Sequence, residues 1–298
     1  MFEKILVPLD GSDVAETALR YAEEFARRLS SELVLYHVCG PEHEHFARMH
    51  KVYLDDLARN IEANLKRRRA PEIKVSTQVE IGQPAQNVCN LVESQQIRLV
   101  VMSAVGASTP RIAHVLGSVA DQVCRTVPVP VLLVRPEHVR QTAEDKRLIG
   151  RILVPLDGSE LSAKAMAVAE EIARRFDASI TLFRMAHIVN PAGLDGADII
   201  PSVSYLQLTQ QQEQRVRDEL LEVEKALRAK GIPVTHQVTT GINAAEEIIG
   251  VGSKARADLV VMSTHGRSGI TRWAMGSVAE RVLRHGTLPL LLVNARAG

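Results

Sequence analysis

Short strand-like runs alternate with amphipathic segments along the whole chain. The runs cover residues 5–9, 32–38, 74–81, 97–102 and 129–134, and most of them are apolar along their length. The segment after the first run has apolar residues at helical spacing, at Ala15, Ala18, Leu19 and Ala22. Apolar strands that alternate with helices predict an α/β fold, with a parallel sheet covered by helices on both faces.

The chain contains this pattern twice. The octapeptide ILVPLDGS at residues 5–12 recurs at 152–159, LVVMS at 99–103 recurs at 259–263, and GSVA at 117–120 recurs at 276–279. The second copy has matching strand-like runs at residues 151–156, 179–185, 234–239, 258–262 and 288–293. A period of this length indicates duplicated domains. We therefore expect two tandem domains, residues 1–138 and 149–298, each with a five-stranded parallel sheet.

The two copies are joined and elaborated by polar segments. Residues 136–149 read PEHVRQTAEDKRLI and are charged and turn-prone, as is typical of a linker. The second copy has about thirteen additional residues between its first and fourth strands. Residues 186–212 combine turn residues, apolar patches and glutamines, and three interpretations fit them: a lid, a partner surface or a longer loop.

Composition excludes several classes of partner. The 298 residues carry a net charge of +1, which gives no electrostatic reason to expect nucleic acid or an anionic membrane as a partner. No apolar run approaches the roughly 20 residues that span a bilayer, and residues 1–12 lack the layout of a signal peptide. Cys39, Cys89 and Cys124 are isolated in the sequence, which favours reduced thiols. We expect a cytoplasmic protein.

Residues 260–283 contain the clearest candidate for a binding site. The apolar run at 259–262 leads into a small polar turn, Ser263 to Gly266, and Gly269 provides a second flexible point. Gly276 and Ser277 then open a segment with helical spacing. Glycines allow the backbone to approach a phosphate, and the free N–H groups at a helix start point toward it. The sequence therefore predicts an anion site in the second copy.

Four motifs resemble those of the universal stress protein family, and the resemblance covers nearly the whole chain. They are VPLDGS after the first strand, GQPA before the third helix, DLVVMSTHG at residues 258–266 and GSVAERV at residues 276–282. The resemblance implies two Rossmann-like domains of the flavodoxin-like, adenine nucleotide alpha hydrolase-like type. It also implies ATP or a related adenine nucleotide as ligand, with or without Mg²⁺. Dimerisation through the last strand is implied too, as a homodimer or as a pseudo-dimer of the two copies within one chain, and the protein partner is unknown.

The resemblance also assigns binding residues. Nucleotide-binding members of the family carry Gly, two residues, Gly, nine residues, then Gly-Ser or Gly-Thr, and the second copy matches with Gly266 and Gly276-Ser277 but has Ser263 at the first position. The implied binding set is Pro155, Asp157, Met185, Ser263, His265, Gly266, Arg267, Gly269, Gly276, Ser277 and Val278. Local roles remain open beside these: Asp157 as a cap of its own turn, Met185 as core packing, and His265 as a residue that holds its own loop. No catalytic residue and no metal ligand is assigned.

The first copy departs further from the family pattern. Ten residues separate Gly106 from Gly117, Pro110 among them has no N–H to donate, and Val105 stands at the position of His265. We expect this copy to bind nucleotide poorly or not at all.

Three functions remain open on this basis. The leading hypothesis is an adenine-nucleotide-binding regulatory protein of the stress response that performs no dedicated chemistry. The second is a slow ATPase or phosphotransferase, although residues 263–277 contain no Asp or Glu to position water. The third is a structural dimerisation module without nucleotide. His43, His45 and His50 fit neither a zinc-protease nor a zinc-finger spacing, and we expect them on a surface helix.

Overall fold

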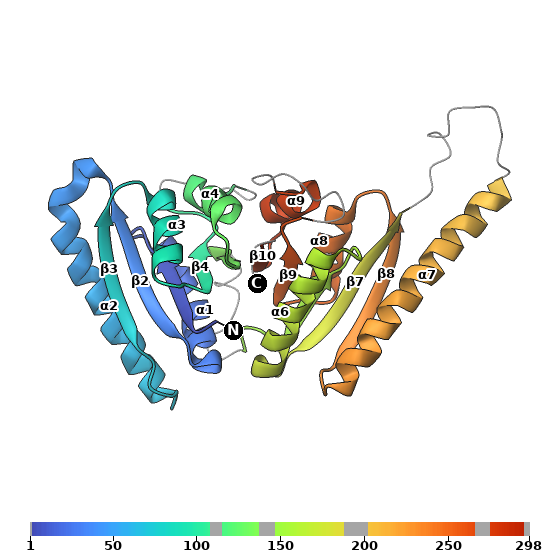
Figure 1. The fold of residues 1–298 in the computed structure, drawn as a ribbon, viewed down its shortest axis with the longest axis horizontal. Helices are drawn as coiled ribbons and strands as arrows, with labels where there is room; N and C mark the ends of the chain where they lie inside the picture. Colours follow the sequence, from blue (N-terminus) through green and yellow to red (C-terminus); the bar gives the residue numbers. More distant parts are fainter. Residues whose placement is uncertain (1, 108–114, 137–146, 188–201, 266–274, 295–298) are drawn as a thin grey trace.

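The computed structural model describes residues 2–107, 115–136, 147–187, 202–265 and 275–294 (Figure 1). The first half of the chain forms β1 (Lys4–Pro8), α1 (Asp13–Leu29), β2 (Glu32–Cys39), the 3-10 helix η1 (Pro41–Phe46), α2 (Ala47–Arg67), β3 (Val75–Ile81), α3 (Pro84–Ser94), β4 (Leu99–Ser103), α4 (Ser118–Thr126) and β5 (Val131–Val134). The second half forms β6 (Arg151–Pro155), α6 (Glu160–Phe176), β7 (Ser179–His187), α7 (Ser202–Ala229), β8 (Val234–Gly241), α8 (Ala244–Lys254), β9 (Leu259–Ser263), α9 (Ser277–His285) and β10 (Leu290–Val293).

Each strand predicted from the sequence is present, and its ends differ from the prediction by no more than two residues. The last strand of each copy begins later than its apolar run because a proline precedes it. Pro130 stands before Val131, and Pro289 stands before Leu290. Proline has no N–H to donate to a neighbouring strand. Its carbonyl still accepts, and the Pro130 oxygen lies 3.0 Å from the amide nitrogen of Val100.

Part of the insertion of the second copy belongs to the described residues. Residues 188–201 lie outside the described residues, whereas residues 202–212 form the beginning of α7. The interpretation of the segment as a longer loop is therefore wrong from Ser202 onward. The extra length extends a helix of 28 residues that packs along β7 and β8.

The strands form one sheet in the order β3-β2-β1-β4-β5-β10-β9-β6-β7-β8. Within each half all neighbouring strands are parallel. The strand order of each half reverses between its first and fourth strands, β1 and β4 or β6 and β9. Loops that leave such a point diverge to opposite faces of the sheet and open a crevice at the carboxyl ends of the strands.

The two halves are joined through their last strands. β10 pairs with β5 in antiparallel fashion, with Leu291 opposite Leu132 at the middle of the pairing. Both side chains are fully buried. The predicted pairing of last strands thus occurs within the chain, and it places β3 with α2 at one end of the molecule and β8 with α7 at the other (Figure 1).

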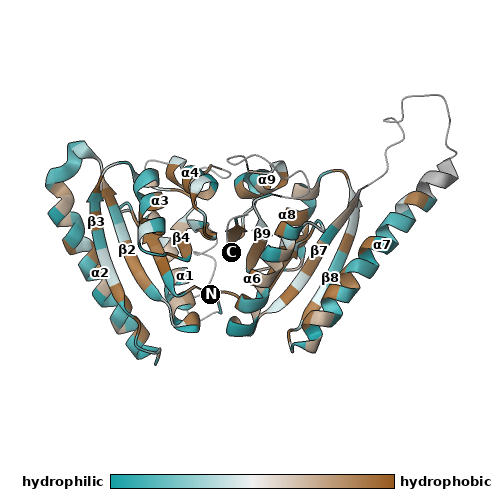
Figure 2. Cartoon of the chain, viewed as in Figure 1, coloured by the Kyte–Doolittle hydropathy of each residue, from teal (hydrophilic) through white to brown (hydrophobic). Residues whose placement is uncertain are grey.

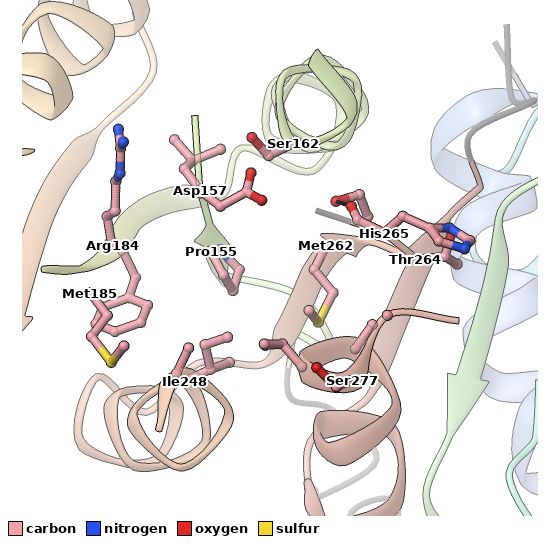
Figure 3. Close-up of a pocket in the computed structure, with 17 residues that line it drawn as sticks. Pro155, Asp157, Ser162, Arg184, Met185, Ile248, Met262, Thr264, His265 and Ser277 are labelled. Atoms are coloured by element: carbon pink, nitrogen blue, oxygen red, sulfur yellow. Dashed lines mark hydrogen bonds between the residues drawn. The ribbon is translucent and has the colours of Figure 1, made fainter. Parts of the chain in front are cut away.

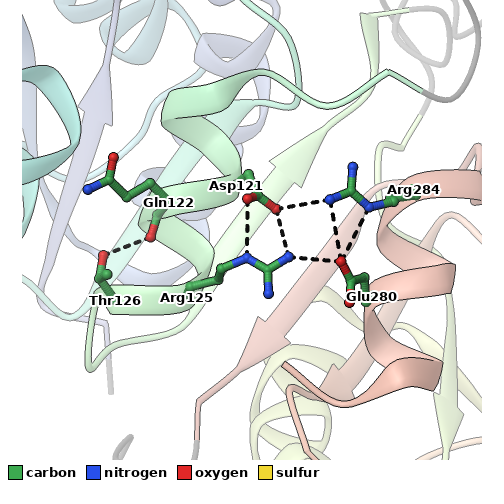
Figure 4. Close-up of polar contacts among 6 residues, drawn as sticks. All are labelled: Asp121, Gln122, Arg125, Thr126, Glu280 and Arg284. Carbon is green, nitrogen blue, oxygen red and sulfur yellow. Dashed lines mark hydrogen bonds and ion pairs between the residues drawn. The ribbon is translucent and has the colours of Figure 1, made fainter. Parts of the chain in front are cut away.

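Ion pairs between α4 and α9 cross the same junction (Figure 4). Arg125 on α4 lies 3.0 Å from Asp121 of its own helix and 2.9 Å from Glu280 on α9. Arg284 on α9 makes the reciprocal contacts, 3.3 Å to Glu280 and 3.7 Å to Asp121. The four charges alternate in sign, so each of these four contacts joins opposite charges.

Each face of the continuous sheet carries one hydrophobic core. Helices α1, α2, α6 and α7 cover one face, and their buried side chains form a single cluster that runs through both halves. Helices α3, α4, α8 and α9 cover the other face in the same way. Hydrophilic residues dominate the outward sides of the two long helices α2 and α7 (Figure 2). The predicted two-layered covering of a parallel sheet is therefore present.

Among the described residues, no helix combines the length and the apolar character needed to cross a bilayer. All three cysteines belong to the described part of the chain and are free thiols, with Cys39 and Cys124 buried and Cys89 half-buried.

Candidate functional site

A cavity of about 330 Å³ opens at the carboxyl ends of β6 and β9, at the switch point of the second half (Figure 3). It is bounded on its other sides by β7, α8 and the N-terminus of α9. Eight of the residues proposed from the sequence line this one cavity: Pro155, Asp157, Met185, Ser263, His265, Gly276, Ser277 and Val278. The remaining three, Gly266, Arg267 and Gly269, lie outside the described residues.

The beginning of α9 is the part of the cavity suited to an anion. Gly276 is the N-cap residue, with an extended backbone conformation and no side chain to accept from the helix. Its own N–H donates to the carbonyl of Thr264 at 2.9 Å, which fixes the helix end beside β9. The N–H groups of Ser277, Val278 and Ala279 belong to the first turn, where no intrahelical acceptor exists. These groups and the positive end of the helix dipole face the cavity.

The turn after β9 is held by its own side chains. The hydroxyl of Ser263 donates to the carbonyl of His265 at 2.7 Å, and Thr264 Oγ1 lies 3.0 Å from His265 Nδ1. Ser263 therefore braces the loop in place of the family's glycine. His265 Nε2 is buried and has no hydrogen-bond partner among the residues that the structure describes.

Burial lowers the pKa of His265 below its ordinary value. At neutral pH the imidazole is therefore uncharged, because the shift moves it further below pH 7. His265 offers a ligand a hydrogen bond and no positive charge. Any charge complement to a phosphate has to come from the α9 N-terminus or from an arginine.

Asp157 holds its own turn and also lines the cavity. Its Oδ1 accepts from the backbone N–H of Ser159 at 3.0 Å and from the Ser159 hydroxyl at 2.6 Å. The Ser159 hydroxyl in turn accepts from the N–H of Ser162 at 3.1 Å and caps α6. The carboxylate thus organises its own turn, and it also lines the cavity. Among the described lining residues it is the one carboxylate.

The opposite wall of the cavity is apolar. Phe183 and Met185 of β7, Ile248 of α8 and Met262 of β9 line it. All four are largely buried, with Met185 at 8% exposed. A wall of this kind suits a flat, uncharged ring system. Met185 therefore packs in the core and lines the cavity at the same time.

Arg184 was not predicted from the sequence. It lines the cavity, its side chain is only 12% exposed, and its Nη1 lies 2.5 Å from Glu219 of α7. A Cβ added to Gly158 would lie 2.9 Å from Arg184 Nη2, so the guanidinium packs against the turn that follows β6. The available signal was an arginine in the middle of an apolar strand, flanked by Phe183 and Met185.

The first half has a smaller counterpart of the cavity, about 140 Å³, at the ends of β1 and β4. Asp10 holds its loop closed there. The N–H of Ala107 donates to Asp10 Oδ2 at 2.7 Å, and a Cβ added to Gly106 would lie 2.6 Å from the same oxygen. The loop after β4 therefore packs directly on the carboxylate.

A polar cluster includes Tyr36, which lines this smaller cavity. The hydroxyl of Tyr36, at the position of Phe183, donates to Glu80 Oε2 at 2.6 Å, and Asn87 donates to the same oxygen at 2.9 Å. The second half has Thr239 in place of Glu80. The two copies thus differ in cavity volume and in lining.

Comparison with known proteins places both halves in one family. The model of the universal stress protein family matches residues 1–135 and 149–294. A universal stress protein of Methanocaldococcus jannaschii is 32% identical over 148 residues, which cover 50% of this chain and 84% of that protein. A universal stress protein of Mycobacterium tuberculosis is 25% identical over 299 residues, covering 97% of this chain and 96% of that one. The tandem arrangement is thus shared along the whole length.

Solved structures share the fold. The crystal structure of a universal stress protein from Archaeoglobus fulgidus superposes with a TM-score of 0.69 at 18% identity, and covers 98% of this chain and 96% of that chain. A further solved universal stress protein, similar to 45% of this chain, is in complex with cAMP.

Proposed function

This chain belongs to the universal stress protein family, and from that premise we propose that it binds an adenine nucleotide, ATP or a close relative, in the cavity of its second half. Nucleotide occupancy then alters the shape of the protein or its choice of protein partner in a stress response. Chemistry on the nucleotide is not required for that role.

The observation that carries the proposal is the size and lining of one cavity. At about 330 Å³ it lies within the range of small-molecule sites, about 300–1,000 Å³. An apolar wall stands on one side and an uncapped helix N-terminus on the other, which matches a ligand with a flat base at one end and phosphates at the other. The cavity of about 140 Å³ in the first half is below that range.

In this arrangement the base packs against Phe183 and Met185, and the phosphates meet the N–H groups of Ser277 and Val278. The family resemblance assigns Gly266, Arg267 and Gly269 to the same phosphate site, and these three lie outside the described residues. We expect Asp157 to accept from a ribose hydroxyl or to share Mg²⁺ with the phosphates.

The residues that line this cavity favour nucleotide binding over nucleotide hydrolysis. Phosphoryl transfer needs a group that positions the attacking water or hydroxyl near the γ-phosphate. The one carboxylate among the described lining residues, Asp157, accepts two hydrogen bonds from Ser159 and lies at the end of β6. We therefore expect at most a slow ATPase.

The two copies provide a matched pair of variants for the test. Gly276 and Gly117 have nearly the same backbone conformation, φ −63° and ψ 146° against φ −65° and ψ 145°, which other residues adopt without strain. Gly276→Val places a side chain at the proposed phosphate position, so we expect it to abolish nucleotide binding. Gly117→Val should leave binding unchanged. Isothermal titration of nucleotide-stripped protein with ATP, AMP and cAMP measures both.

The number of nucleotides bound per chain shows how many of the two sites work. One nucleotide per chain supports a single working site in the second half, and two per chain would mean that the first site also works. Equal losses in the two glycine variants would contradict the asymmetry. Absence of binding by all three nucleotides would favour the structural dimerisation module, and phosphate release above the Gly276→Val background would favour an enzyme.

A further inference from the structure

A cluster of three metal-ligating side chains lies in the first half, and none of the three lines either cavity. His37 and Cys39 come from the end of β2, and His50 comes from the first turns of α2. One ligand atom of each lies within 4.8 Å of the other two. His37 and Cys39 are buried, at 6% and 2% exposed, and His50 is half-buried.

The cluster faces the side of β2 opposite to the small cavity. Tyr36 and Val38 line that cavity, and successive residues of a strand point to opposite faces of the sheet. His37 and Cys39 therefore share the face that α1 and α2 cover. The cluster belongs to the first half and the nucleotide proposal concerns the second half, so the two are independent.

His37 is already oriented as metal-ligating histidines are. Its Nδ1 lies 2.8 Å from the carbonyl oxygen of Leu9. A carbonyl only accepts, so Nδ1 carries the proton and Nε2 keeps its lone pair. A ring N–H donated to a backbone carbonyl is the usual outer contact of a histidine ligand, because it fixes the tautomer and the ring orientation.

His50 was grouped with His43 and His45 in the sequence, and the structure separates them. His43 and His45 are exposed on η1, whereas the ring of His50 stacks on His37 with centroids 3.8 Å apart and planes 16° apart. The cluster thus combines His50 of α2 with two residues of β2. The spacing of these residues along the chain does not predict that they meet.

The second half lacks the cluster. The positions of His37 and Cys39 hold Arg184 and Ala186 in β7, and Arg184 pairs with Glu219. The fold itself therefore does not require a histidine and a cysteine at these positions.

We propose that His37, Cys39 and His50 bind one transition-metal ion, Zn²⁺ being the ion that their chemistry suits. Two imidazoles and a thiolate form a mixed nitrogen and sulfur set that zinc prefers and that Mg²⁺ and Ca²⁺ do not. Three protein ligands leave the fourth tetrahedral position to water. The Cys39 thiol releases its proton to solvent on binding, because the thiolate is the ligand.

Binding requires a modest rearrangement at His50. Zinc bonds of about 2.0–2.3 Å bring tetrahedral ligand atoms to roughly 3.3–3.7 Å of one another. Stacked rings direct their lone pairs side by side, so the His50 ring turns toward Cys39 when the ion enters. The ion then links the end of β2 to α2.

The test is a titration of the full-length, reduced protein with Zn²⁺ in competition with a chromophoric chelator. We expect one equivalent per chain, and a loss of affinity of at least about tenfold in His50→Ala and in Cys39→Ser. Co²⁺ in place of Zn²⁺ should give a thiolate-to-metal charge-transfer band that Cys39→Ser lacks. Thermal melts without metal show whether each variant is folded.

The double variant His43→Ala/His45→Ala is the matched control, because it removes two exposed imidazoles close to His50 in sequence. It should bind Zn²⁺ as the unmodified protein does. Zn²⁺ should also raise the melting temperature of the unmodified protein and not that of His50→Ala. Equal affinity in the unmodified protein and Cys39→Ser, loss of binding in the control, or no binding at all would overturn the proposal.

Discussion

At the scale of single residues, the pKa of His265 is a measurable property that should respond to a ligand in the cavity of the second half. Its pKa is lowered from the ordinary 6.5 by burial, so the folded state resists protonation. Its contribution to stability is complete above pH 6.5 and is lost as the pH falls from there through the pKa of the folded state. Proton NMR of the imidazole should give a titration midpoint below 6.5 in nucleotide-free protein.

A bound phosphate should reverse part of that shift, since a nearby negative charge favours the imidazolium. We expect the His265 midpoint to rise when ATP is added. An unchanged midpoint in the ATP complex would place the phosphates away from His265 and toward the other end of the cavity.

Substitutions at Gly158 and Gly11 test whether the guanidinium of Arg184 contributes to nucleotide binding. Both glycines have left-handed backbones, φ +82° and φ +84°, and a Cβ at Gly11 has open space with its nearest neighbour, His50 Cε1, at 4.0 Å. Gly158→Ala and Gly11→Ala should each lower the free energy of unfolding by about 1–2 kcal/mol. Only Gly158→Ala displaces Arg184, so it alone should also weaken nucleotide binding. Denaturant unfolding and calorimetric titration measure the two effects, and equal affinities would argue against a role for Arg184.

The repeated motifs of the sequence were enough to predict part of the cavity lining. The eight described residues of the predicted set line one cavity because each stands at a strand end or at a helix start, and those positions converge in a parallel sheet. Arg184 and the cluster around His37 were not predicted. Their significance depends on which face of a strand meets which helix, and that depends on tertiary packing rather than on spacing along the chain.

At the scale of elements, helices α4 and α9 are joined by ion pairs that are partly exposed to solvent. Arg125 is 25% exposed and Glu280 is 36% exposed, so solvent screens the pair. Arg125→Ala should lower the free energy of unfolding by no more than about 1 kcal/mol, and the loss should shrink in high salt. Urea unfolding of the single and double variants with Glu280→Ala at two salt concentrations gives the coupling energy. A coupling that high salt leaves unchanged would contradict this account.

The elements themselves were largely predictable. Apolar runs of four to eight residues separated by helical periodicity located the strands, because buried parallel strands have no polar face to obscure them. The start of α7 was missed because residues 202–212 are rich in glutamine and serine and lack a strong apolar stripe. The segment continues into the part of α7 that packs along β7 and β8, and this packing rather than local sequence stabilises the helix.

At the scale of the whole molecule, the junction of β5 and β10 determines the assembly. Each half presents its last strand as an edge that the other half covers in antiparallel fashion. Residues 149–298 alone would expose β10, whose side chains are all buried in the intact chain. Exposed apolar edge strands pair with one another.

We therefore expect residues 149–298, produced separately, to dimerise through β10 in place of β5. Analytical ultracentrifugation should show a dimer, and Leu292→Pro should shift it toward monomer, because the N–H of Leu292 points to the edge that β5 covers and proline removes that ladder donor. The full-length chain at the same concentration is the control, with the edge already covered. A folded fragment that sediments as a monomer would contradict this expectation.

The covalent connection of the two halves has a consequence for how the protein diversifies. In a pair of identical subunits every substitution is present at both sites at once, so neither pocket changes alone. Because β5 and β10 belong to one polypeptide, Asp10 can bind the loop at Ala107 in one pocket while the pocket lined by Asp157 keeps a volume of about 330 Å³. Gene duplication followed by fusion thus yields an obligate heterodimer of fixed one-to-one composition, in which one lobe is free to acquire a separate task.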